Sequence, residues 1–141
     1  YIEESIMPRL YREAPVNSIW EGSGNVMCLD VLRAMFREQA AIPAVLDEVD
    51  AARGENANLD RAVNRLKEEL NDPADMELRA RGLTELMAVT LTASLMVRCA
   101  PTAVADAFCA SRLGSLWTGC YGALPAAVDF DTIISRANPA Q

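Results

Sequence analysis

The sequence has 141 residues, 51% of them apolar, which is enough for one domain with a packed core and argues against a disordered chain. The net charge is −7, so the chain lacks the overall basic balance of a typical nucleic-acid-binding domain, although local basic patches remain compatible with it. Histidine is absent, which removes the commonest general base and metal ligand, and we expect no metal site.

Helical periodicity dominates the chain, and no alternating strand pattern is found. Proline and glycine punctuate it, most clearly at residues 14–17, 21–25, 54 and 71–73. The pattern predicts helices over residues 3–13, 25–38, 42–52, 58–70, 75–99, 101–116 and 131–137. We expect Asn58 to cap the fourth of these helices and Pro101 to begin the sixth. The predicted fold class is all-α, a helical bundle.

The longest uncharged apolar run, residues 86–97, is too short for a bilayer, which needs about 20 residues, so we expect a buried core helix and no membrane partner. The four cysteines, Cys28, Cys99, Cys109 and Cys120, form no C-x-x-C pair, and we expect no signal peptide. We expect buried, reduced thiols and a cytoplasmic protein. Since Tyr1 stands inside a helical pattern, we also expect a piece of a longer protein.

One segment, residues 18–25, has a composition suited to chemistry: Ser-Ile-Trp-Glu-Gly-Ser-Gly-Asn. Glu21 follows Trp20, and a carboxylate beside an apolar wall is partly desolvated, which raises its basicity and suits a general base. The glycines allow a ligand to approach the backbone, and the N–H groups of the helix that follows favour an anion such as a diphosphate. The alternative is an ordinary helix entrance, with an exposed Glu21 and Ser23 as the N-cap.

The residues around this segment carry a resemblance to a known family. Residues 1–4 (Tyr-Ile-Glu-Glu), 8–13 (Pro-Arg-Leu-Tyr-Arg-Glu) and 17–25 (Asn-Ser-Ile-Trp-Glu-Gly-Ser-Gly-Asn) resemble the C-terminal signature of the flavin-dependent acyl-CoA dehydrogenases. The signature is an arginine-bearing helix, a short turn, and then an aromatic residue followed by Glu-Gly-Thr/Ser. Residues 20–33 resemble in particular the AidB-like branch, which is linked to the alkylation response.

The resemblance implies a reaction and a cofactor. In such enzymes the glutamate at the position of Glu21 removes a proton from the α-carbon of an acyl-CoA thioester, while the β-hydrogen leaves as hydride to N5 of FAD. Trp20 would line the acyl pocket, where much of the family has tyrosine and therefore more room. The residues implied in FAD contact are Ile19, Trp20, Glu21, Gly22, Ser23, Gly24 and Asn25. The implied partners are an electron-transfer flavoprotein and further copies of the chain in a tetramer.

The same branch is associated with DNA binding through its C-terminal helices, which implies a second interpretation: an FAD- and DNA-binding alkylation-response protein with little turnover. Arg33 and Arg37 are the first candidates, since residues four apart share a helix face. Further possibilities are Arg61, Arg65, Arg79, Arg81, Arg98 and Arg112. The alternative is a solvated arginine, or one paired locally as Asp30 would allow for Arg33. The resemblance divides the chain into residues 1–40, which carry the flavin and base motif, and residues 41–141, an extra helical region.

Overall fold

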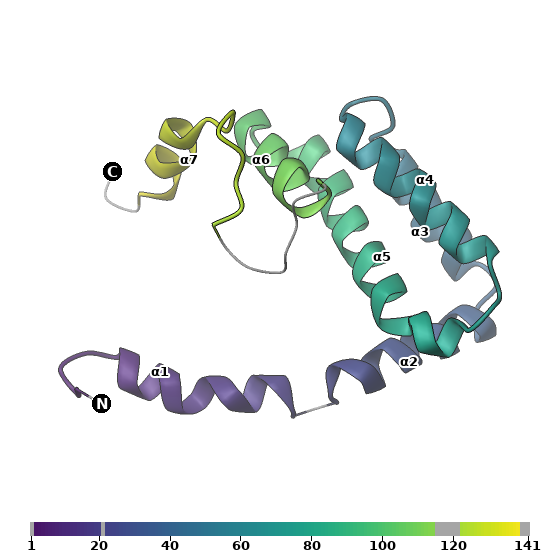
Figure 1. The fold of residues 1–141 in the computed structure, drawn as a ribbon, viewed down its shortest axis with the longest axis horizontal. Coiled ribbons are helices and arrows are strands. Elements are labelled where there is room, and N and C mark those ends of the chain that lie inside the picture. The colour runs from purple at the N-terminus through teal and green to yellow at the C-terminus, as the bar shows by residue number, and fades with distance from the viewer. Residues whose placement is uncertain (1, 21, 115–121, 139–141) are drawn as a thin grey trace.

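The computed structural model describes residues 2–20, 22–114 and 122–138 (Figure 1). Over these residues it contains helices and no strand, so the predicted all-α class is confirmed. The elements are α1 (Met7–Glu13), the 3-10 helix η1 (Ala14–Ser18), α2 (Gly24–Arg37), α3 (Ala41–Asp50), α4 (Ala57–Asn71), α5 (Met76–Cys99), α6 (Thr102–Arg112) and α7 (Phe130–Ala137).

The long helix α5 is the axis of the bundle, and α2, α3, α4 and α6 all pack on it (Figure 1). Two apolar clusters hold these helices together. Val49, Leu59 and Cys109 belong to the cluster formed by α3, α4, α5 and α6. Leu32 and Leu66 belong to the other, formed by α2, α4 and α5. The fold therefore fixes α2, and the motif that precedes it, against α5.

By contrast, α1 and η1 pack on each other and extend away from the bundle as a separate arm (Figure 1). Only Pro8 is buried in this arm. The first helix begins at Met7, four residues later than predicted, because Pro8 is accommodated in a first turn, where its missing N–H has no intrahelical partner in any case. The predicted break at residues 14–17 is a short 3-10 helix that continues α1.

Two predicted helix starts are wrong. The N-cap of α4 is Asn56, whose Oδ1 accepts hydrogen bonds from the backbone N–H groups of Asn58 and Leu59 at 3.0 and 3.3 Å. Asn58 is already inside the first turn. Pro101 is the N-cap of α6 and the helix starts at Thr102, since the extended ψ of 139° at Pro101 lies outside the helix. The helix ends at Arg112, four residues before the predicted end at residue 116, so that prediction is also wrong.

Among the described residues, α5 is the helix that is long and apolar enough to cross a membrane, judged by length and composition alone. In this structure it is the central helix of the bundle, but only 22% of its apolar window is buried, so the prediction of a buried core helix is confirmed only in part. Its fully buried side chains include Thr90, Ala93 and Ser94, and the Ser94 hydroxyl donates to the Glu48 backbone carbonyl at 2.9 Å. Part of its surface is open, because Leu78 is 85% exposed.

The prediction that all the cysteines are buried is wrong. Cys28 and Cys109 are buried free thiols, whereas Cys99 is a free thiol exposed to solvent. Cys99 is the last residue of α5. Cys120 lies outside the described residues.

Candidate functional site

The motif of residues 18–25 forms the junction between the arm and the bundle. Glu21, the predicted base, lies outside the described residues. On its N-terminal side, the N–H groups of Ile19 and Trp20 both donate to the carbonyl of Val16 at 3.0 Å and so close the end of η1. The side chains of Ile19 and Trp20 are 70% and 57% exposed. The predicted acyl-pocket wall is therefore an open apolar surface on this chain.

On its C-terminal side, the motif enters α2 through a turn that requires glycine. Gly22 has a φ of +115°, a conformation that side chains with a Cβ rarely adopt. Ser23 occupies the N-cap position, but its hydroxyl makes no capping hydrogen bond, so it does not act as a side-chain cap. The first turn of α2 also contains no acidic residue. Its first N–H groups have no intrahelical partner and are suited to an anionic group.

A residue far away in the sequence completes this entrance. The Arg81 guanidinium, on α5, donates a hydrogen bond from Nη1 to Oδ1 of Asn25 at 2.9 Å. It lies so close to Gly24 that a Cβ added there would be 2.9 Å from Nη1. An open hollow of about 250 Å³ lies beside the helix start, and both a basic and an acidic residue of α5, Arg81 and Glu77, line it. The other lining residues are Asn25, Cys28, Leu29, Leu78 and Ala80. In the sequence Arg81 is only one of several surface arginines, since no local pattern relates it to Asn25.

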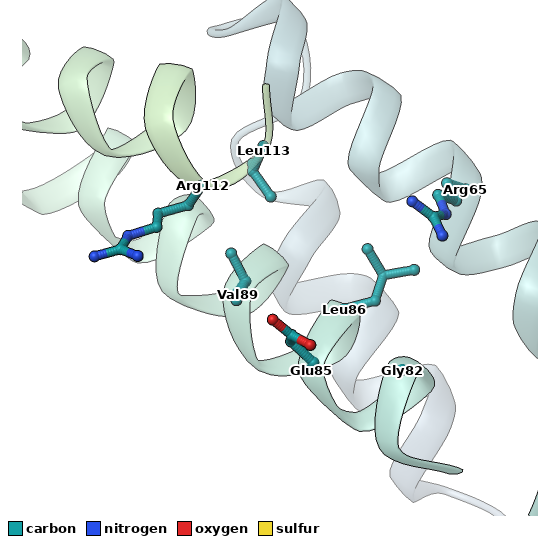
Figure 2. A pocket seen from close by; sticks show the side chains of 7 residues that line it. All are labelled: Arg65, Gly82, Glu85, Leu86, Val89, Arg112 and Leu113. Atoms are coloured by element: carbon teal, nitrogen blue, oxygen red, sulfur yellow. The ribbon is translucent and has the colours of Figure 1, made fainter. Parts of the chain in front are cut away.

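A second hollow lies further along α5, between α4 and the end of α6 (Figure 2). Leu86 and Val89 form its apolar floor, Arg65 stands on the α4 side, and Arg112 on the α6 side extends away from Arg65 (Figure 2). A neighbouring hollow of about 550 Å³ adds Arg61 to the lining. We call this surface the arginine groove. It also has one acidic lining residue, Glu85, and its full lining is Arg61, Ala62, Arg65, Gly82, Glu85, Leu86, Val89, Arg112, Leu113 and Gly114. Arg61, Arg65 and Arg112 are among the further DNA-binding candidates of the sequence, but their sharing of one hollow was not predicted, because they come from separate helices.

The two predicted DNA-binding arginines lie on α2 and do not line the arginine groove. Arg33 forms an ion pair with Asp30, one turn earlier, as the local alternative allowed. Arg37 is exposed in the last turn of α2. Arg33 and Arg37 therefore do not share a hollow with the arginines of α4 and α6, and the two groups do not form one basic surface.

The described groups with a shifted pKa lie away from the motif. The hydrogen bond from Lys67 is the main reason that the pKa of Asp50 is lowered, and the hydroxyl of Thr132 lowers the pKa of Asp129. Burial raises the pKa of Cys109 to about 11, with a smaller contribution from Asp106, so this thiol stays protonated at neutral pH. These are structural groups of the bundle and of the α7 N-cap. No cluster of acidic, cysteine or histidine side chains suited to a metal occurs in the described part of the chain.

The chain combines a helical bundle with a glycine turn and an open helix entrance, and an exposed Trp beside a glutamate precedes them. This is the class of structure expected for the helical C-terminal portion of a flavin-dependent dehydrogenase. No protein-family model matches the chain. The sequence is 43% identical over 109 residues to AidB of Escherichia coli (strain K12), a protein whose name assigns it provisionally to the acyl-CoA dehydrogenases. It is also 35% identical over 68 residues to acyl-CoA dehydrogenase family member 11 of Caenorhabditis elegans.

These matches cover 77% and 48% of the chain, but only 20% and 11% of the two relatives. The chain thus spans about a fifth of the length of AidB. It belongs to the acyl-CoA dehydrogenase family, in the AidB-like branch, and corresponds to the C-terminal helical portion of that fold. The family resemblance inferred from residues 1–33 is confirmed.

Proposed function

We propose that this chain is the part of an FAD-dependent acyl-CoA dehydrogenase that supplies the catalytic base and the flavin-contacting turn. The observation that carries the proposal is the entrance of α2. It has a glycine-dependent turn at Gly22, a first turn without acidic residues, and an arginine above Gly24 and Asn25. Donor groups and positive charge gathered at one helix start suit the diphosphate of FAD, so the residues present fit this cofactor.

The proposed reaction is the α,β-oxidation of an acyl-CoA thioester. The carboxylate of Glu21 takes a proton from the α-carbon, and the electron pair of that C–H bond forms the new C=C bond. FAD, when bound, supplies the acceptor for the hydride that leaves the β-carbon. Trp20, exposed beside Glu21, would provide an apolar wall for the acyl chain and keep water from the base. The product is a trans-2-enoyl thioester, and an electron-transfer flavoprotein would reoxidise the cofactor.

The arm supports the view that the chain works inside a larger assembly. Large apolar side chains are exposed along it, and a contiguous apolar surface of this kind usually marks an interaction site. The exposed apolar side chains of the arm are Ile2, Ile6, Met7, Leu10, Tyr11, Val16, Ile19 and Trp20. In the intact protein we expect this face to be covered by the other domains or by further subunits. A cytoplasmic tetramer, expected by resemblance, is part of the proposal.

The test uses the intact FAD-loaded protein. Acyl-CoA substrates of several chain lengths are added without oxygen, and the bleaching of the flavin absorbance is followed for wild type, Glu21→Gln and the control Glu38→Gln. Removing a general base typically slows the step by about 10²- to 10⁴-fold. We expect that loss for Glu21→Gln and unchanged bleaching for Glu38→Gln, whose carboxylate lies at the far end of α2. Bleaching that survives Glu21→Gln would remove Glu21 from the base role.

The arginine groove favours the alternative function, an FAD- and DNA-binding alkylation-response protein with little turnover. Three arginines line one hollow, and guanidinium groups can bind phosphate oxygens, although Arg61 already donates to Asn58 and Arg65 is paired with Glu69. Arg33 and Arg37 on α2 lie outside this groove, and Arg33 is paired with Asp30. Against it stands the net charge of −7, since phosphate contacts dominate the affinity for duplex DNA.

The alternative is tested by fluorescence anisotropy with a labelled duplex at several salt concentrations. The variant Arg61→Gln/Arg65→Gln is compared with the charge-matched control Arg9→Gln/Arg136→Gln. If the groove binds phosphate, only the first variant binds more weakly, and the slope of log K against log salt falls by about 1 for each arginine–phosphate interaction that the substitutions remove. Equal binding by both variants would exclude the groove from DNA recognition.

A further inference from the structure

We infer that Arg81 is a positioning residue for the flavin site: its guanidinium holds the carboxamide of Asn25 so that the amide NH2 is presented to the cofactor. The inference rests on the proposed function, which makes Asn25 a residue that contacts FAD. It adds a residue of α5, 56 positions further along the chain, to a site otherwise made of one short segment.

The hydrogen bond itself determines which way the amide of Asn25 faces. A guanidinium has only donors, so the atom of Asn25 that it contacts at 2.9 Å must be the carbonyl oxygen. The NH2 group, with two donors, then lies on the opposite side of the carboxamide. Without Arg81 the side chain could turn over and present its oxygen instead, which an anionic cofactor would repel. Arg81 thereby selects the donor face of Asn25.

The positive charge of Arg81 is not expected to stabilise α2. The N-terminus of a helix carries a partial positive charge and favours acidic side chains, yet here a guanidinium lies against Gly24, the first residue of α2. Within the described part of the chain Arg81 forms no ion pair, unlike Arg79 and Arg98 on the same helix. A cation in this place becomes favourable once an anionic group is bound beside it.

Helix packing holds the backbone of α5 in place at Arg81. The interface between α2 and α5 is the largest between any two elements of the described chain. Ala80 and Leu83, which flank Arg81, are buried in the same apolar cluster as Cys28 and Leu32 of α2. The backbone beneath the guanidinium is therefore fixed relative to the start of α2, while the side chain itself remains exposed. A residue so placed can orient Asn25 without contributing to the core.

The experiment measures the dissociation constant of FAD for the intact protein, by flavin fluorescence after removal and re-addition of the cofactor. The variants are Arg81→Gln, Asn25→Ala and the double variant, with Arg136→Gln on the exposed helix α7 as the charge-matched control. Losing one hydrogen bond with a charged partner should weaken binding about tenfold. We expect this loss for Arg81→Gln, none for Arg136→Gln, and no further loss when Arg81→Gln is added to Asn25→Ala. Arg81→Lys, which keeps a donor, should recover part of the affinity.

Two outcomes would overturn the inference. One is an affinity for Arg81→Gln equal to that of Arg136→Gln. The other is a tenfold loss that persists undiminished in the Asn25→Ala background, because Arg81 would then act on FAD without Asn25. In both cases the wild type binds FAD and the proposed function stands. If the wild-type protein binds no FAD, the proposed function fails first and the role of Arg81 fails with it. Thermal unfolding of the cofactor-free variants, expected to be unchanged, separates positioning from a general loss of structure.

Discussion

The arm and the bundle use the same kinds of residue in opposite ways. In the arm, residues 2–20, apolar side chains as large as Tyr11 and Trp20 are exposed, and α1 and η1 pack mainly on each other. In the bundle, Val49, Leu59 and Leu66 are fully buried. The bundle therefore satisfies its own apolar surface, whereas the arm needs another surface to cover it. The motif of residues 18–25 lies at the boundary, where a cofactor and a substrate can be reached from outside.

The contrast between the two regions is tested most severely by removing a large side chain from each. Leu59→Ala should lower the free energy of unfolding by about 2–5 kcal/mol, because Leu59 is fully buried and its loss leaves a cavity. Leu10→Ala in the arm removes the same atoms from a half-exposed site and should cost well under about 1 kcal/mol in the isolated chain. Urea unfolding of both variants measures the difference. Equal losses would mean that the arm packs as firmly as the bundle.

A smaller effect is expected at the start of α4. Asn56→Ala removes the side-chain oxygen that accepts from the N–H groups of Asn58 and Leu59, and should cost about 1 kcal/mol. Asn58→Ala, at the position wrongly predicted as the cap, should cost less, since its side chain contacts only the exposed Arg61. The unfolding temperatures of the two variants show which asparagine caps α4. A larger loss for Asn58→Ala would contradict the observed cap.

The ion pair between Asp50 and Lys67, which joins the end of α3 to α4, should make the bundle sensitive to acid. The hydrogen bond from Lys67 lowers the pKa of Asp50 below its ordinary value of 3.8. The contribution, under about 1 kcal/mol, is present above that value and is lost as the pH falls through the lowered pKa. Urea unfolding at neutral pH and in acid should show a smaller difference for Asp50→Asn than for wild type. An identical acid response would exclude this ion pair as a cause.

The smallest effect on stability is expected at the motif, where the exposed arm meets the buried bundle. Trp20→Ala should leave the unfolding of the isolated chain unchanged, because the indole is exposed. In the intact protein the same change should weaken acyl-CoA binding, since the acyl wall would be lost. Calorimetric unfolding of the chain and a substrate titration of the intact protein give the two measurements. Destabilisation of the isolated chain would show that Trp20 packs within it.

Local features could be predicted well. The segment predicted as residues 25–38 is α2 at Gly24–Arg37, and the segment predicted as residues 75–99 is α5 at Met76–Cys99. Periodicity and the proline and glycine breaks are properties of neighbouring residues. The errors lie at helix starts such as Asn56, where two asparagines compete for one cap and the hydrogen-bond geometry decides.

Residues close together in the chain are enough to specify a series of helices, a glycine turn at residues 22–24 and a family signature around Glu21. Which arginines matter depends instead on how the helices pack. Arg81 reaches Asn25 because α5 packs on α2, and Arg61, Arg65 and Arg112 share a groove because α4, α5 and α6 meet there. Side chains from separate helices become neighbours only through packing, so their spacing along the chain does not reveal how close they lie in space.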